Sequence, residues 1–170
     1  QALVIDFEGV PTTYYGMYGN QNLGGYYAGL WFGPDATILD RVISGYNSAY
    51  YPPHSGNAIL YSDLAPYIRV DFVAATAEHV GVWYTSYYSL HLEAYDASGN
   101  LLAASVGTST YPSASRWLAV DAPDIAYVIV HDSGNYFGID DFTYECNVAP
   151  VVTAPAEQTA SEGLGQTFAL

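Results

Sequence analysis

Apolar and polar residues alternate along most of the chain, which is the pattern of half-buried β-strands. The alternation is clearest in residues 67–74, 79–84 and 90–96. It also predicts strands at residues 2–8, 30–32, 37–39, 58–61, 101–106, 116–120, 125–131 and 136–145. Turn residues separate these segments, and none of them has the apolar spacing of an amphipathic helix.

This succession of about ten short strands predicts an all-β fold, an antiparallel β-sandwich with the jelly-roll arrangement. A closed barrel is the alternative. Long loops early in the chain and hairpins later favour the jelly roll. We expect the module to occupy residues 1–146.

The sequence changes character after Cys146. Residues 147–155 are rich in proline, valine and alanine, which predicts an extended linker. Residues 156–170 resemble the truncated start of a bacterial immunoglobulin-like repeat, through the pattern PxVTxPxxQTxxEG that begins in the linker. We therefore expect a module of a longer protein, tethered to immunoglobulin-like domains.

The charge of the chain is strongly acidic. Its 170 residues include 17 acids and three bases, for a net charge of −14, and none of the bases is lysine. So few cations exclude a nucleic acid or an anionic membrane surface as partner. No apolar run reaches the roughly 18 residues of a membrane span, so no membrane insertion is expected. The lysine-free, tyrosine-rich composition favours a secreted or cell-surface bacterial domain.

Two acidic motifs lie at opposite ends of the expected module. Asp6 and Glu8 belong to the first strand, whereas Asp140 and Asp141 lie in the last one. First and last strands of a sandwich are often neighbours, so these carboxylates are expected to meet without a lysine to neutralise them. A Ca²⁺ ion would do so; the alternative is that the acids are solvated edge residues.

The FE segment at residues 7–8, paired with FGIDDFTY at 137–144, resembles the jelly-roll carbohydrate-binding modules of bacterial glycoside hydrolases. The resemblance implies a structural Ca²⁺ ion held by Glu8 and by Asp140 or Asp141, with Asp6 as a neighbour. Residues 92–103 and 138–144 are also similar to β-sandwich domains of bacterial secreted and exosortase-sorted proteins.

Three predicted strands carry aromatic and polar side chains opposite their core positions. If these strands share a face, the rings can stack on sugars while the polar groups bind hydroxyls. The expected first contacts are Trp83, Tyr95, His91, Glu93 and Arg69. The alternative is that other chain segments cover this face, and that the rings belong to the core.

Tyrosine doublets in two loops form a second candidate surface. Tyr50, Tyr51, Tyr87 and Tyr88 offer contact area at low entropic cost, as in antibody loops. The alternative is that they only pack the loops together.

Signals for catalysis are weak. The four histidines (His54, His79, His91 and His131) show no metal-ligand spacing, and no GxSxG elbow occurs. The sequence therefore predicts a noncatalytic module that binds a polysaccharide or another glycan. The alternative is a cell-surface adhesion or matrix domain that contacts protein or serves as a spacer.

Overall fold

The computed structural model describes residues 1–14, 22–33, 35–111 and 114–147. The expected immunoglobulin-like start and nearly all of the expected linker lie outside these residues. The described part forms eleven strands and one short 3₁₀ helix, η1 (Thr12–Tyr14). None of its helices is long and apolar enough to cross a membrane.

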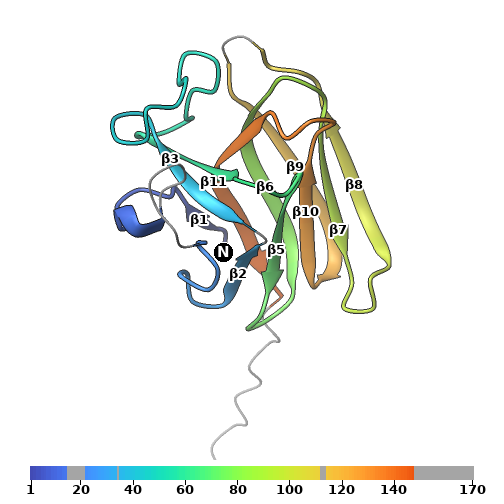
Figure 1. Ribbon diagram of the computed structural model, residues 1–170. Coiled ribbons are helices and arrows are strands. Elements are labelled where there is room, and N and C mark those ends of the chain that lie inside the picture. Colours follow the sequence, from blue (N-terminus) through green and yellow to red (C-terminus); the bar gives the residue numbers. More distant parts are fainter. Residues whose placement is uncertain (15–21, 34, 112–113, 148–170) are drawn as a thin grey trace, which may run out of the picture.

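The strands make two antiparallel sheets that pack face to face (Figure 1). The β11 sheet has the order β3 (Ala36–Asp40), β4 (Ala58–Ser62), β11 (Phe137–Cys146), β6 (Ala77–Ser86), β9 (Arg116–Ile125), and β1 (Leu3–Ile5) also pairs with β11. The β10 sheet has the order β2 (Leu30–Gly33), β5 (Tyr67–Phe72), β10 (Tyr127–His131), β7 (Leu90–Tyr95), β8 (Leu101–Gly107).

The chain crosses repeatedly between the two sheets. From β4 to β7 each strand lies in the sheet opposite the one before it, and β9, β10 and β11 alternate in the same way. This confirms the predicted all-β fold, an antiparallel sandwich with jelly-roll connections. The predicted strands are present, although β6 and β9 extend beyond the predicted 79–84 and 116–120.

The core lies between the sheets and follows from the period-two pattern. In β5 the residues Ile68, Val70 and Phe72 are buried, and β7 buries alternate residues in the same way. Phe32 of β2 makes edge-to-face contacts with Phe142 of β11, their ring centroids 5.6 Å apart. These contacts join the two sheets around their first and last strands.

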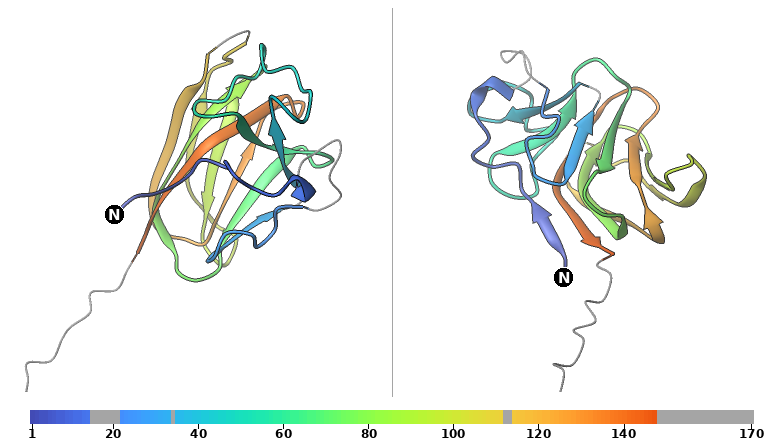
Figure 2. Two further views of the ribbon diagram at one scale, coloured as in Figure 1. Left: turned by 90° about the vertical axis from the view of Figure 1, so that its left-hand side faces the viewer. Right: turned by 90° about the horizontal axis from the view of Figure 1, so that it is seen from below.

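The first and last strands are neighbours. Leu3 pairs with Tyr144 and Ile5 with Phe142, and Figure 2 shows β1 running beside β11. The register of β11 then shifts between Asp140 and Thr143, where it pairs with β6. This bulge, with Asp141 at a positive φ of 45°, places two successive acids beside the loop that precedes β4.

Candidate functional site

The expected sugar contacts do not share one face. Trp83 lies on β6 in the β11 sheet, whereas Arg69, His91, Glu93 and Tyr95 lie on β5 and β7 in the β10 sheet. The predicted single cleft is therefore wrong. Because consecutive jelly-roll strands alternate between sheets, the same polar periodicity points to two opposite outer faces.

On the outer face of the β10 sheet, Arg69, Tyr127 and Tyr95 form a column across three strands. The Arg69 guanidinium carbon lies 3.7 Å from the centre of the Tyr127 ring. The Tyr127 and Tyr95 rings are stacked with centroids 5.0 Å apart and planes 8° apart. Each ring thus covers a face of its neighbour, which leaves less ring surface for a sugar. Asp71 accepts two hydrogen bonds of 3.0 Å from Nε of Arg69.

Beside this column, two histidines meet that the sequence did not associate. His91 of β7 pairs in register with His131 of β10, and Glu93 lies two residues from His91 on the same face. The Tyr95 hydroxyl donates a 2.6 Å hydrogen bond to Oε2 of Glu93. That hydrogen bond is the main reason why the pKa of Tyr95 is raised to about 12, and burial is the second reason. One ligand atom from each of His91, Glu93 and His131 lies within 4.8 Å of the other two, a grouping that the spacing of the histidines along the sequence did not indicate.

Trp83 lies in a second group on the outer face of the β11 sheet. His54 stacks on it, with ring centroids 3.7 Å apart and planes 4° apart, and Trp117 lies at 5.8 Å. Trp83 and Trp117 line an open hollow together with Val4, Asp141 and Thr143. One face of Trp83 is thus already taken by imidazole, and Trp117 is the more exposed ring.

Trp31, the exposed residue of β2, was not among the expected contacts. Its side chain is 54% exposed although it lies on a strand. The ring passes over Gly25 and Gly33, where an added Cβ would come within 3.3 and 3.2 Å of it. Glycine at these positions lets the indole lie close to the backbone. The signal in the sequence is its outward position in the strand LWFG.

The two acidic motifs converge on one loop. Oε1 of Glu8 accepts hydrogen bonds from the backbone N–H groups of Asn57 (2.6 Å) and Ala58 (2.8 Å). Oδ2 of Asp140 accepts one from the N–H of Ser55 (2.8 Å). The pairing of β1 with β11 thus brings the first and last strands together as expected. Asp6 is exposed and accepts a hydrogen bond from the Glu8 N–H.

The charge at this point suits a cation, but the carboxylates alone do not enclose one. Burial, with a contribution from Asp141, raises the pKa of Asp140 to about 6. However, Glu8, Asp140 and Asp141 are not a group whose ligand oxygens all lie within 4.8 Å of one another in the described chain. A Ca²⁺ ion would need carbonyl oxygens of the 54–58 loop as well. Calcium stays a prediction, made from the unneutralised carboxylates and from the resemblance.

Loop tyrosines of the β3–β4, β6–β7, β8–β9 and β10–β11 connections contact one another. We call five of them the tyrosine rim: Tyr50, Tyr87, Tyr88, Tyr111 and Tyr136. Their exposed fractions run from 41% to 54%. Tyr50 stacks on Tyr111 at 5.2 Å, and Tyr87 lies 4.7 Å from Tyr111 and 4.9 Å from Tyr88.

A cavity of about 270 Å³ lies beside the rim and shares Tyr136 with it. We call it the tyrosine cavity, because its polar and aromatic wall consists of Tyr46, Tyr51, Tyr61, Tyr136, Asn47, Asp63 and Asn135. Of these wall residues, only Tyr51 was among the ligand contacts expected from the sequence. The others were not expected, because they come from the β3–β4 loop, from β4 and from the turn before β11, which only the fold brings together.

Two polar atoms at the tyrosine cavity lack a partner. The Tyr46 hydroxyl and Oδ1 of Asn135 are buried without a hydrogen bond. The amide nitrogen of Asn135, by contrast, donates to the Ser62 carbonyl at 3.0 Å. Burial raises the pKa of Tyr46, of Tyr51 and of Tyr61. These phenols therefore stay protonated at neutral pH and are available as O–H donors.

Several solved structures are similar to this chain. A DUF4465 family protein from Bacteroides caccae superposes with a TM-score of 0.58, at 12% identity over 86% of this chain and 100% of that one. A family 29 carbohydrate-binding module gives 0.47, at 9% identity over 90% and 99%. A carbohydrate-binding module from Clostridium stercorarium, in complex with cellobiose, gives 0.43, at 14% identity over 71% and 88%. No protein-family model and no curated protein matches the chain.

Proposed function

We propose that the chain is a noncatalytic module that binds carbohydrate in the tyrosine cavity, with the tyrosine rim contacting further sugar rings. The fold is compatible with many functions, so the function is inferred from the residues of the site. The observation that carries it is the pair of buried, unpartnered polar atoms, the Tyr46 hydroxyl and Asn135 Oδ1, in an aromatic cavity. Unpaired buried polar groups are costly. Because Tyr46 and Asn135 line the cavity, a small shift of their side chains on binding would let the hydroxyl groups of a ligand satisfy both atoms.

The chemistry of the wall matches that of a sugar. A sugar ring presents apolar C–H faces, which stack on aromatic rings, and hydroxyls that donate and accept hydrogen bonds. Tyr51 and Tyr136 supply rings, while Asn47, Asp63 and Asn135 supply polar groups. The cavity of about 270 Å³ lies near the lower end of ligand pockets, roughly 300 Å³, which suits a short stretch of a glycan.

The negative charge of the chain argues against acidic glycans as ligands. The chain carries a net charge of −14, and Asp63 lies in the wall of the cavity. Uronate or sulfate groups would be repelled. We therefore propose a neutral polysaccharide as the ligand.

We also propose that the module works outside the cell, secreted or at the cell surface, next to immunoglobulin-like domains. Its lysine-free composition and the pattern in residues 150–170 support this setting. A structural Ca²⁺ ion held by Glu8 and by Asp140 or Asp141 belongs to the same proposal, supported by the convergence of these acids on the loop before β4.

The tyrosine rim favours a second candidate function, adhesion to a protein. Five neighbouring tyrosines, each at least 41% exposed, give a surface of the kind that antibodies use. Such a surface binds without needing the tyrosine cavity, so the two functions predict different effects of changes in the cavity.

An array of neutral plant, algal and bacterial polysaccharides, probed with the full chain, tests the proposal. Binding to at least one neutral polysaccharide, and weaker binding by a Tyr51→Ala variant, is expected. The loss of one stacked ring, worth about 0.5–1.5 kcal/mol, weakens binding roughly twofold to tenfold. Trp117→Ala, an exposed ring on the other face, is the matched control. Silence across the array favours adhesion.

A further inference from the structure

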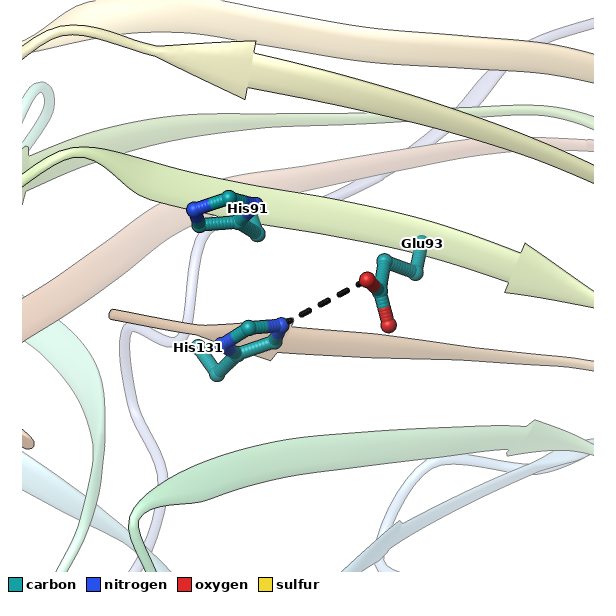
Figure 3. A group of neighbouring side chains, drawn as sticks. All are labelled: His91, Glu93 and His131. Carbon is teal, nitrogen blue, oxygen red and sulfur yellow. Dashed lines mark ion pairs between the residues drawn. The ribbon is translucent and has the colours of Figure 1, made fainter. Parts of the chain in front are cut away.

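We propose that His91, Glu93 and His131 form a binding site for a divalent transition-metal ion of the Zn²⁺ type. The site lies on the outer face of the β10 sheet and is separate from the tyrosine cavity and from the acidic loop contacts. Neither the resemblance nor the proposed function requires it. The inference stands on these three side chains and their surroundings (Figure 3).

The strand register brings the three ligands together. β7 and β10 are antiparallel neighbours, with His91 opposite His131 and Glu93 opposite Ile129. Side chains at positions i and i+2 of a strand point to the same face, so Glu93 lies beside both imidazoles. Figure 3 shows the two rings on neighbouring strands and the carboxylate turned towards them.

The distances suit a metal ion after small adjustments. Nε2 of His131 lies 3.6 Å from Oε1 of Glu93. One ligand atom from each of the three residues lies within 4.8 Å of the other two. Bonds of about 2.1 Å in a tetrahedral arrangement place ligand atoms roughly 3.4 Å apart. The two imidazole rings are stacked, with centroids 4.9 Å apart and planes 8° apart, so at least one ring has to rotate before both nitrogens point at one ion.

The donor set selects the class of ion. Imidazole nitrogens suit Zn²⁺, Cu²⁺ and Ni²⁺, whereas Ca²⁺ and Mg²⁺ prefer oxygen ligands. Two histidines and one glutamate leave further coordination positions open. All three side chains are only partly buried, with 33% of His131 and 25% of Glu93 exposed, so an ion can reach them.

A further hydrogen bond already orients one ligand. The Tyr95 hydroxyl donates to Oε2 of Glu93 at 2.6 Å, which leaves Oε1 as the atom nearer to His131. Such bonds from outside the ligand shell fix the orientation of a metal-binding carboxylate. Tyr95 is held in turn by its stack on Tyr127.

The surrounding charges do not oppose a cation. Arg69 is the charged base on this face, and Asp71 neutralises it through a bidentate contact. The other histidine–carboxylate pairs, His79 with Asp121 and His54 with Asp141, each contain one imidazole. Within the described chain, no other set of three such residues meets the same distance criterion.

Titration calorimetry with Zn²⁺ tests the site, using the full chain freed of metal by chelation, at neutral pH. We expect one Zn²⁺ ion per chain. His91→Gln and His131→Gln should each weaken binding by more than about 100-fold, because they remove a ligand. Tyr95→Phe should weaken it roughly tenfold, because it only frees the carboxylate. His79→Gln is the matched control and should bind as the unaltered chain does.

Melting curves of each variant establish that it is folded. If one histidine variant is unstable, Glu93→Gln removes a ligand from the same set and answers the same question. Co²⁺ in place of Zn²⁺ adds a spectroscopic readout of histidine ligation. Absence of Zn²⁺ binding, or unchanged affinity in both histidine variants, would overturn the proposal. Neither result bears on carbohydrate binding at the tyrosine cavity.

Discussion

His54 lies parallel to Trp83, with their ring centroids 3.7 Å apart, while its Nδ1 is 2.6 Å from Oδ2 of Asp141. One side chain of the β3–β4 connection is thereby fixed to both β6 and β11. The same connection contributes Tyr46 and Tyr51 to the wall of the tyrosine cavity. The contact therefore holds that wall against the sandwich.

Replacing His54 by alanine should lower the free energy of unfolding by about 1–2 kcal/mol, because the ring stack and the contact with Asp141 are both lost. Thermal and urea unfolding measure the effect. His79→Ala is the control, since its partner Asp121 is 79% exposed and such surface pairs contribute little. Equal losses in the two variants would contradict the anchoring role of His54.

Stability should depend on pH through Asp140 in calcium-free buffer. Burial raises the pKa of Asp140 from 3.8 to about 6, so the native state binds this proton more tightly than the unfolded chain. The resulting stabilisation is complete below about pH 4 and is lost as the pH rises to about 6, on the order of 2 kcal/mol. Asp140→Asn should flatten this part of the curve of unfolding free energy against pH, whereas Asp121→Asn should not.

The calcium prediction has a direct test in the melting temperature. A cation bound to Asp140 and Asp141 stabilises the native state that holds it, so added Ca²⁺ should raise the melting temperature and a chelator should lower it. Asp6→Asn is a control, because Asp6 is only a neighbour of the expected ligands. A melting temperature that changes neither with added Ca²⁺ nor with chelator would contradict the prediction of a structural Ca²⁺ ion.

Gly107 should tolerate no larger residue. A Cβ there would collide with the hydroxyl of the buried Tyr84, which donates a 2.8 Å hydrogen bond to the Thr108 carbonyl. Gly107→Ala should therefore destabilise the protein by about 1–3 kcal/mol in urea unfolding. The ring carbon Cζ of Tyr84 would also lie 2.5 Å from the added Cβ, so Tyr84→Leu, which removes the far end of the ring, should let the double variant recover part of the loss. Simple additivity of the two changes would argue against this collision.

The sequence predicted the strands well, because the period-two pattern is local. Residues 67–74 and 90–96 alternate regularly, and the structure has β5 and β7 there. The pairing of β1 with β11 also followed from general sandwich topology. The jelly-roll topology also allowed β6 to lie in the sheet opposite β5 and β7, as it does. Which of the two arrangements holds is decided by long-range pairing, which leaves no local pattern in a single sequence.

The same reason explains what was missed at the candidate sites. His91 and His131 are 40 residues apart, and only the register of β7 with β10 places them side by side. Tyr111 and Tyr136 were not singled out, because neither is part of a doublet. They join the tyrosine rim through contacts with Tyr87.

On the proposed function, a neutral sugar in the tyrosine cavity satisfies the buried hydroxyl of Tyr46. In the free protein this hydroxyl has no partner, so Tyr46→Phe should leave the melting temperature unchanged or raise it.

The most direct measurement is titration calorimetry of Tyr46→Phe and the unaltered chain with the best polysaccharide from the array, with Trp117→Ala as control. We predict that Tyr46→Phe binds roughly threefold to tenfold more weakly, as the loss of one hydrogen bond implies, while Trp117→Ala is unaffected. Equal affinity of Tyr46→Phe and the unaltered chain would contradict the role of the Tyr46 hydroxyl in binding the sugar.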